Sequence, residues 1–427
     1  ERVSFAPQPQ SAMTIIDQHT GYVKAIIGGR GTKTASLTLN RATDSTRQPG
    51  STFKIVSTYA AALNEKGMTL ATTYEDQPIT YDNGAPVNNA SGSFNGTTTI
   101  RTAIRNSVNT VAVQCFEDVT PELGLKYLDN FGFTTLAHGT EADTDANGNV
   151  YTDANLPTAL GGLTYGVKNV ELCAAYAAIA NGGNYIKPVY YTKILDHNGN
   201  VLIENNSVGR SVIKETTAYL LTSALEDVVQ NGTGTACQLD NMAVAGKTGT
   251  TDAYNDLWFV GYTPYYTCAV WSGYDGNQKI PEGDARNFHK TLWRKVMNRI
   301  HQGMEYKDFE VPDGIEQISI CADTGLLPRV GCPVTEEYFD VGTMPTENCD
   351  QHFYEYDESQ DEDMEIYDEN ATPTPDPENP DGTDNTDGSG GDGTGGDGTG
   401  GDGTGGGDIQ YPDESGGDSG NDDIYYY

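Results

Sequence analysis

Ser51 and Lys54 stand three positions apart where a loop gives way to an expected helix. In "RQPGSTFKIVSTYAAALNEKG", Pro49 and Gly50 end the loop, and apolar residues then recur at helical spacing until Gly67. Since three residues make nearly one helical turn, the lysine can fold back toward the serine hydroxyl. A serine hydroxyl is a weak nucleophile near neutral pH, and a lysine becomes its base when burial or a neighbouring positive charge lowers the pKa of the amine. The pair therefore indicates nucleophilic catalysis by Ser51 with Lys54 as the base.

The spacing of these two residues is not specific by itself. A serine in the first turn of a helix often does no more than cap it. S-x-x-K recurs at residues 211–214, S-x-N occurs at Ser93, Ser107 and Ser419, and K-T-G occurs once, at residues 247–249. Because no Pro-Gly pair precedes Ser211, we expect that serine to be a helix cap.

Order and context select the other members of the site. Ser107 interrupts a helical pattern in "TIRTAIRNSVNTVAVQCF", whereas Ser93 lies in a Gly/Ser/Asn loop and Ser419 in the acidic C-terminal segment. Lys247 begins "KTGT" on a β-rich run after Gly246, where an edge strand could face a cleft. A helix start, a polar loop and a strand can therefore form three walls of one site.

Two explanations are available for a glycine at position 249. A side chain there would point into the space where an extended substrate lies along the strand edge, so the smallest residue is expected. A simple bulge glycine is the alternative.

The charge of the chain is strongly acidic and uneven. The 427 residues carry 61 Asp and Glu against 25 Lys and Arg, and 24 of the acids lie from Asp350 onward, where there is no Lys or Arg. The preceding part therefore has 37 acids against 25 bases. Such a surface repels phosphate backbones, so nucleic-acid binding is not expected.

The sequence contains no apolar run near the ~18 residues of a membrane-spanning helix and no signal peptide. It opens on "ERVSFAPQPQ", which we interpret as a cut through a linker. We therefore expect the chain to be a fragment.

The strand and helix patterns predict an α+β fold. "AMTIIDQHTGYVKAIIGG" is typical of a β-hairpin around Gly21, and a mostly helical middle is expected from Ser51 to about Gly182. "MAVAGKTGT", "DLWFVGYTP" and "YTCAVWSGYD" are three later strand patterns. This order predicts one sheet built from both ends of the domain, with a helical insertion between them.

The seven cysteines include no CxxC pair, so a structural zinc site is not indicated. Cys115 and Cys173 lie in apolar helical patterns and are expected in the core. Cys321, Cys332 and Cys349 come later, and a histidine, His352, stands three positions after the last of them. A disulfide in an exported protein and a metal site both remain open for this group.

The three motifs in this order resemble those of the transpeptidase domain of class A, bifunctional penicillin-binding proteins. The resemblance extends to "ALGGLTYGVKNVELCAAYAAIANGG", "VVQNGTGTA", "AVAGKTGTTDAYNDLWFVGYTP" and "VWSGYD". It runs from about Ser11 to Gly303 and continues to about His352. It implies a penicillin-binding or serine β-lactamase-like fold, with an antiparallel sheet covered by helices and an all-helical lobe.

The resemblance implies a division of the chain into four parts. Residues 1–10 would be a linker remnant and 11–305 the transpeptidase domain. Residues 306–354 would be a cysteine-containing appendage, and 355–427 an acidic Gly/Asp/Pro-rich tail. That tail's composition buries too little apolar surface to offset chain entropy, so we expect it to be disordered.

For catalysis, the resemblance makes Ser51 the nucleophile that attacks the carbonyl between two D-alanines of a peptidoglycan stem peptide. Lys54 would accept the serine proton. Ser107 would pass a proton to the departing D-alanine amine, and Asn109 would hold Lys54 and the acyl-chain amide.

For substrate binding, the resemblance makes Lys247 a source of positive charge beside the Thr248 and Thr250 hydroxyls, which would bind the terminal carboxylate. Gly249 lies between these threonines. The backbone N–H groups of Ser51 and Thr250 would form the oxyanion hole.

The partners implied are a D-Ala-D-Ala donor peptide, an amine acceptor and β-lactams, with no cofactor and no metal. The location implied is the cell-wall-facing side of the plasma membrane, with the membrane reached only through an N-terminal anchor absent from this sequence. Since the family's glycosyltransferase domain is also absent from this sequence, no glycan polymerisation is expected of it.

Three other classes of protein remain as alternatives. A serine β-lactamase would need a glutamate in a loop to hold a hydrolytic water, and none could be assigned. A β-lactam sensor would bind antibiotic without turnover but would not normally carry the appendage and tail. A non-catalytic wall-binding protein would have decayed motifs, and all three are intact. The six histidines show no Ser-His-Asp order near Ser51, which disfavours a histidine triad.

Overall fold

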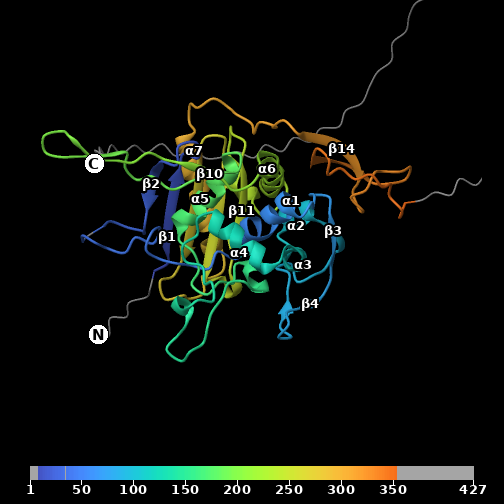
Figure 1. Cartoon of the computed structure of the whole chain (residues 1–427), viewed down its shortest axis with the longest axis horizontal. Coiled ribbons are helices and arrows are strands. Elements are labelled where there is room, and N and C mark those ends of the chain that lie inside the picture. Colours follow the sequence, from blue (N-terminus) through green and yellow to red (C-terminus); the bar gives the residue numbers. More distant parts are fainter. Residues whose placement is uncertain (1–7, 34, 353–427) are drawn as a thin grey trace, which may run out of the picture. The chain divides into compact units, whose positions relative to one another are not determined.

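The two ends of the predicted domain meet in one antiparallel five-stranded sheet (Figure 1), in a computed structural model that describes residues 8–33 and 35–352. The strand order is β11-β12-β13-β1-β2. The strands are β1 (Gln10–Ile16), β2 (Val23–Ile27), β11 (Ala245–Thr250), β12 (Asp256–Tyr262) and β13 (Thr267–Gly273). The predicted hairpin is confirmed, since β1 pairs with β2 and Gly21 takes a positive φ of 73° in the turn between them. Because β11 is an edge strand, its outer side is free to face a site.

Helices cover both faces of this sheet. Alternate side chains of β12 and β13 point to opposite faces. Trp258 and Trp271 join the large core on the side of α5 (Asn169–Ala180). Phe259 packs edge-to-face on Trp293 of α7 (Phe288–Ile300), with ring centroids 4.9 Å apart. Both strands are therefore buried along their whole length.

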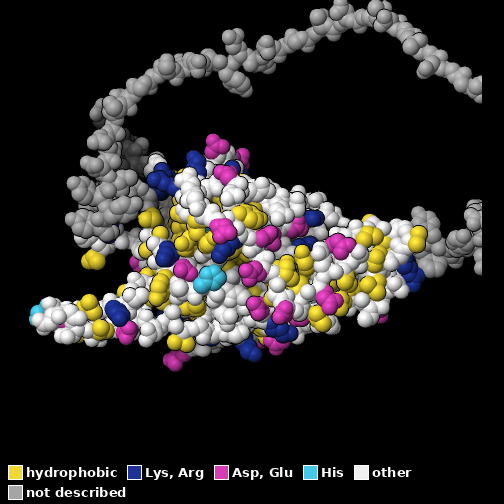
Figure 2. All heavy atoms as spheres, turned by 90° about the horizontal axis from the view of Figure 1, so that it is seen from above, with side chains coloured by type: hydrophobic (Ala, Val, Ile, Leu, Met, Phe, Trp, Pro, Cys, Tyr) yellow, Lys and Arg dark blue, Asp and Glu magenta, His cyan; other side chains and the backbone are white. Residues whose placement is uncertain are grey.

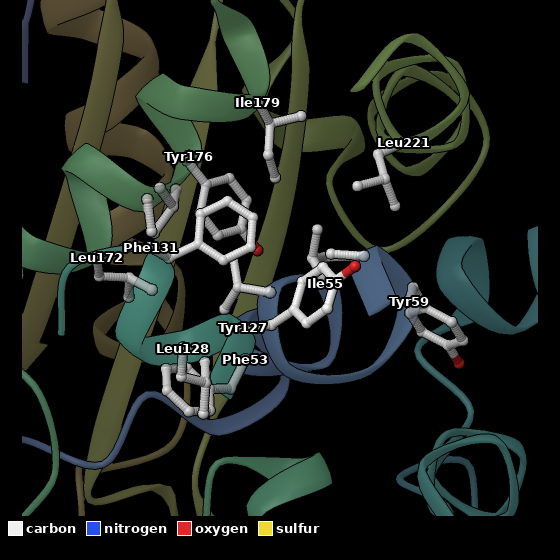
Figure 3. Packing of buried hydrophobic residues seen from close by; sticks show 14 of the residues in the cluster. Phe53, Ile55, Tyr59, Tyr127, Leu128, Phe131, Leu172, Tyr176, Ile179 and Leu221 are labelled. Carbon is white, nitrogen blue, oxygen red and sulfur yellow. The ribbon is translucent and has the colours of Figure 1, made fainter. Parts of the chain in front are cut away.

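The segment that carries the S-x-x-K motif is a continuous helical run buried among other helices. It comprises a 3₁₀ turn η1 (Gly50–Thr52), a π-helical turn η2 (Ile55–Tyr59) and α1 (Ala60–Glu65), joined without a break. Figure 3 shows Phe53 and Ile55 packed among residues of α4 (Pro121–Asn130), α5 and α6 (Glu215–Gln230). Buried apolar residues on either side of Lys54 hold this run in place, and the lysine itself is fully buried.

The middle of the chain is less helical than predicted. The helical lobe is present, with α2 (Ile100–Asn106) and α3 (Asn109–Val119) beside α1 and α4, but two short ribbons interrupt it. The ribbons are β3 (Thr73–Asp76) with β6 (Gly96–Thr99), and β4 (Ile79–Thr80) with β5 (Pro86–Val87). Residues 131–168 contain only the short turns η3 (Glu141–Asp143) and η4 (Leu156–Leu160). Threonine-rich segments such as "GTTT" favour strands over helices, which accounts for part of the difference.

Ser211 is not the helix cap that the sequence predicts. It ends the exposed strand β10 (Gly209–Ser211), which pairs with β7 (Asn184–Ile186), and the cap position of α6 is occupied by Lys214. The prediction failed because pairing with β7 extends the chain up to Ser211, so the helix begins later.

The remaining short elements between residues 193 and 287 are β8 (Lys193–Leu195), β9 (Val201–Glu204), η5 (Thr235–Cys237), η6 (Asp252–Tyr254) and η7 (Asp284–Asn287).

The cysteine-containing appendage is a hairpin of β14 (Ile315–Cys321) and β15 (Val334–Asp340) that contacts the helices. Arg101 of α2 donates two hydrogen bonds of 2.6 Å to the buried carboxylate of Glu337. Tyr338 packs edge-to-face on Tyr219 of α6, with centroids 5.4 Å apart. A bidentate, partly buried ion pair of this kind fixes orientation as well as distance, so the hairpin is anchored to the helix that leads into Ser107.

Several expectations fall on residues outside the described ranges, namely most of the linker remnant, the acidic tail and Ser419. Within residues 8–33 and 35–352, every helix is too short or too polar to cross a membrane. Asp and Glu side chains are interspersed with Lys and Arg on the face drawn in Figure 2, as the composition before Asp350 leads one to expect. Cys115 and Cys173 are fully buried in α3 and α5, which confirms their predicted place in the core.

Candidate active site

Lys54 is fully buried and joins the first two motifs. Its Nζ donates to the carbonyl oxygens of Ser107, at 2.7 Å, and Val108, at 3.2 Å. It also donates to Asn109 Oδ1, at 2.6 Å, and lies 3.4 Å from Ser107 Oγ. Ser93, by contrast, is exposed and bonds only within its own loop. Among the S-x-N matches in the described residues, it is therefore Ser107 that lies beside Lys54.

A sharp corner between two helices aims these acceptors at Lys54. Ser107 ends α2 in the left-handed conformation, with φ 58° and ψ 41°, and α3 begins two residues later at Asn109. The N–H groups of Ser107 and Val108 cap the last carbonyls of α2, which turns their own carbonyls away from the helix. A left-handed serine is uncommon, and such residues cluster at functional sites. The interruption that the sequence indicated at Ser107 is this corner.

Asn109 is held by residues that the sequence analysis did not identify. Its side-chain amide donates to Asn88 O at 2.6 Å, and its backbone N–H donates to Asn89 Oδ1 at 2.8 Å. Asn89 in turn donates to the buried Asp76 carboxylate at 2.6 Å, and so does the Thr110 hydroxyl. This network fixes the amide so that its oxygen faces Lys54. In residues 73–99 only the S-x-N match at Ser93 is visible in the sequence, and nothing there signals Asp76 or Asn89.

Two buried lysines with lowered pKa values lie at the site. Lys247, on β11, is fully buried, and burial lowers its pKa to about 7. The pKa of Lys54 lies well below its usual value, first because of burial and second because of the Lys247 charge. A fraction of the Lys54 population is therefore available as a neutral amine nearer to neutral pH than an exposed lysine would be.

The sheet edge and the start of the S-x-x-K helix approach each other at glycines. A Cβ on Gly249 would lie 2.5 Å from Pro49 O and 2.9 Å from Thr52 Cγ2, so this position faces the helix start and not the space above the strand. The structure thus corrects the reason proposed for Gly249. Gly50 has a φ of 55°, and its Cβ would meet the backbone of Thr250 at 2.8 Å. Only glycine permits this contact between loop and strand.

A cavity of about 480 Å³ opens over these elements. Of the predicted site residues, it is lined by Ser51, Ser107, Asn109, Thr248 and Thr250. Lys54, Lys247 and Gly249 are buried and do not line it. The lining also includes residues that the sequence analysis did not name, among them Asn88, Asn89, Thr233, Tyr254 and Arg286.

The additional lining residues are themselves held in place. Thr233 shares a hydrogen bond of 2.8 Å with the Thr248 hydroxyl, and the Arg286 guanidinium lies over the Tyr254 ring, 3.7 Å from its centroid. Hydroxyls and cationic groups on this rim can bind an anionic end of a ligand. A serine at the start of a helix, a buried lysine behind it and polar donors around one cavity make a serine–lysine site capable of acyl transfer.

Comparison with known proteins places this fold and site in a family. Residues 11–298 match the model of the penicillin binding protein transpeptidase domain, and residues 311–354 match that of the penicillin-binding protein 1A C-terminal domain. The chain therefore belongs to the penicillin-binding protein transpeptidase family, as the motifs predicted.

The curated relatives include several penicillin-binding proteins 1A from Clostridium species. The one from Clostridium tetani is 34% identical over 362 residues, which are 81% of this chain and 45% of the relative. The one from Clostridium novyi is 36% identical over 364 residues, 81% of this chain and 40% of the relative. The chain thus spans less than half the length of these relatives.

Solved structures share the fold. Penicillin-binding protein 1A from Haemophilus influenzae superposes with a TM-score of 0.67 at 24% identity, over 80% of this chain and 54% of that one. The PonA1 protein from Mycobacterium tuberculosis in complex with penicillin V gives 0.62 at 26% identity, over 72% of this chain and 82% of that one. The predicted α+β penicillin-binding fold is confirmed.

Proposed function

We propose that this chain is a serine D,D-transpeptidase that cross-links peptidoglycan stem peptides through an acyl-enzyme on Ser51, and that β-lactams inhibit it by acylating the same serine. The observation that carries the proposal is the fully buried Lys54, bonded to Ser107 and Asn109 on one side and adjoining the turn of Ser51 in the same helical run. Membership of the transpeptidase family supports it.

In the acylation step, neutral Lys54 accepts the proton of Ser51 Oγ as that oxygen attacks the carbonyl between the two D-alanines. The backbone N–H groups of Ser51 and Thr250 stabilise the oxyanion; in studied enzymes the loss of one such donor raises the barrier by about 3 kcal/mol. The approach of the two segments at Gly50 supports this pairing of donors.

In the departure step, Ser107 delivers a proton to the D-alanine nitrogen. After acylation Lys54 is an ammonium group with three N–H donors and no lone pair. Two of them stay on the shortest contacts, Asn109 Oδ1 and Ser107 O, and the third can pass to Ser107 Oγ, 3.4 Å away, as Ser107 gives its own proton to the leaving nitrogen. The acceptor amine then attacks the ester, and the serine regains its proton.

The terminal carboxylate of the donor peptide binds at the sheet edge. Thr248 and Thr250 line the cavity, and Lys247 of the same strand supplies positive charge when it is protonated. The extended peptide lies along the outer side of β11, where backbone groups of an edge strand remain available.

The whole protein would act outside the cytoplasm, where peptidoglycan is cross-linked. We propose a transpeptidase domain to about residue 305 and an appendage over 306–354; the two family matches, to residue 298 and from residue 311, support this division.

Acylation of Ser51 by penicillin tests the proposal directly. We expect a labelled penicillin to attach once per chain, and peptide mapping by mass spectrometry to locate the adduct on Ser51. Ser211→Ala removes the other S-x-x-K serine, whose exposed hydroxyl donates only to Ile213 O at 3.3 Å. This variant should acylate within about twofold of the parent and lose no more than ~0.5 kcal/mol of stability. An adduct elsewhere, or none on the folded protein, would contradict the proposal.

Lys247→Met should shift the pH dependence of acylation to higher pH. The charge of Lys247 lowers the pKa of Lys54, so its removal raises that pKa and reduces the fraction of neutral base at any given pH below it. The second-order rate constant for penicillin acylation, measured as a function of pH, tests this. Lys193→Met, which removes an exposed charge on β8, should leave the profile in place. An unchanged profile in Lys247→Met would show that the two lysines are not coupled.

A further inference from the structure

Four side chains of the metal-binding type meet at the loop end of the β14–β15 hairpin. They are Cys321, Cys332, Cys349 and His352, and one sulfur or ring nitrogen from each lies within 4.8 Å of all the others. Cys321 ends β14, Cys332 lies in the loop before β15, and the other two come from the segment after β15. The sequence left a disulfide and a metal site open for this group; the structure brings all four members to one point.

The separations match those of ligands that share one ion. His352 Nδ1 lies 3.5 Å from Cys321 Sγ and 3.3 Å from Cys349 Sγ. Around tetrahedral Zn²⁺, with Zn–S near 2.3 Å and Zn–N near 2.0–2.1 Å, a sulfur and a nitrogen ligand are about 3.5 Å apart and two sulfurs about 3.8 Å apart. A disulfide would use two of the sulfurs and leave the third thiol and the imidazole without a partner in this arrangement.

The surrounding contacts are those that orient metal ligands. The other ring nitrogen of His352, Nε2, lies 3.2 Å from Asp323 Oδ2, so a carboxylate holds the ring with Nδ1 directed at the sulfurs. The backbone N–H of Arg329 donates to Cys332 Sγ at 3.2 Å, a contact that stabilises a thiolate. Carboxylate–histidine pairs of this kind support zinc sites.

Tight backbone turns bring the cysteines together. Gly325, with a φ of 71°, donates its N–H to Cys321 O at 2.9 Å, and Cys332 donates to Arg329 O at 3.0 Å. Cys349 is drawn to the same place because its N–H donates to Leu327 O at 2.8 Å. The geometry of the cluster is thus built by the main chain and does not depend on flexible side chains alone.

Apart from its contacts with α2 and α6, the appendage has only a small hydrophobic cluster of its own. Its hydrophobic cluster consists of Ile320 and Phe339 packed with Ala71 of the main domain, bordered by the partly buried Ile318 and Met344. Modules near or below ~40 residues seldom stabilise themselves with a hydrophobic core and commonly add disulfides or a metal.

We propose that the appendage binds one structural Zn²⁺ through the Sγ atoms of Cys321, Cys332 and Cys349 and through Nδ1 of His352. Binding displaces the three thiol protons to solvent and gives a four-coordinate site with no open position, which suits a structural ion and no catalytic one. It also protects the thiols from oxidation outside the cytoplasm. This inference departs from the sequence prediction, which assigned no metal ligand.

Metal content of the full 427-residue chain, purified without chelators, provides the test. We expect about one zinc per chain by elemental mass spectrometry, and nearly none in Cys349→Ser or His352→Ala. His352→Cys, which substitutes another zinc ligand, should keep the metal, and so should Cys237→Ser, which removes a buried cysteine outside the cluster. All of these variants retain the 24 acidic residues from Asp350 onward. Zinc bound loosely to carboxylates would therefore give the same zinc content in every variant.

Two further measurements distinguish the metal from a disulfide. Replacement by Co²⁺ should give the thiolate-to-cobalt charge-transfer band and the intense visible bands of a tetrahedral site, lost in Cys349→Ser. After chelation and denaturation, the intact mass should correspond to seven free thiols. A parent protein without zinc, or with a mass two hydrogens lower, would overturn the proposal even if every variant failed to fold.

Discussion

Lys54→Met should lower the rate of penicillin acylation at Ser51 by about 10²–10⁴-fold, the usual contribution of a positioned general base. Methionine has nearly the length of lysine and suits a buried position, but it has no amine to take the serine proton. Stopped-flow acylation with a fluorescent penicillin, at several pH values, measures the loss. Raising the pH should not restore the rate, because methionine has no amine that could lose a proton and act as the base.

The substitution also leaves Ser107 O and Asn109 Oδ1 without their donor, at a cost on the order of 1–3 kcal/mol for each buried acceptor. A control must therefore separate weaker folding from lost chemistry. Thr58→Val lies on the same helical run and breaks the contact of 3.2 Å with the Ser57 hydroxyl, and Thr58 does not line the cavity. It should lower the melting temperature with little effect on acylation. Parental acylation by folded Lys54→Met would exclude this lysine as the base.

The penicilloyl group on Ser51 should persist for many minutes, whereas a D-Ala-D-Ala-like thioester should turn over faster when a suitable amine is added. The β-lactam leaving group stays tethered and obstructs the acceptor path, while D-alanine or a thiolate diffuses away. A β-lactamase would instead place a water against the ester with a carboxylate base. Among the residues described in the structure, the one carboxylate that lines the cavity belongs to Asp252.

Intact-protein mass spectrometry after rapid acylation follows the lifetime of the adduct. Asp252→Asn is the matched variant, because it removes that carboxylate and keeps the size of the side chain. Its adduct should live as long as the parent's. Penicillin hydrolysis at many turnovers per second would favour the β-lactamase alternative, and a longer lifetime in Asp252→Asn would identify its base.

The sequence by itself predicted those features that depend on neighbouring residues. Pro49 and Gly50 before an apolar helical pattern placed Ser51 at a helix start, and closely spaced strand patterns predicted β12 and β13. The family could also be predicted, because the motifs and the sequence around them occur in a fixed order. The side-chain periodicity of a helix or strand is set by local backbone geometry, so a short stretch of sequence is enough to recognise it.

Tertiary structure decided every relation between distant segments. It placed Ser107, and not another S-x-N serine, beside Lys54. The left-handed conformation of Ser107 at this corner could not be predicted from the residue type. It also moved Ser211 from a helix cap to a strand, because β7 pairs with that segment.

The same holds for positions whose neighbours lie far along the chain. Gly249 faces Pro49 across two packed elements, and Asn109 is oriented by Asp76 through Asn89. Cys321 and Cys349 meet because main-chain turns fold the appendage back on itself. Packing and hydrogen bonding of the whole chain set these distances, and such terms depend on which surfaces meet and not on the spacing of residues in sequence.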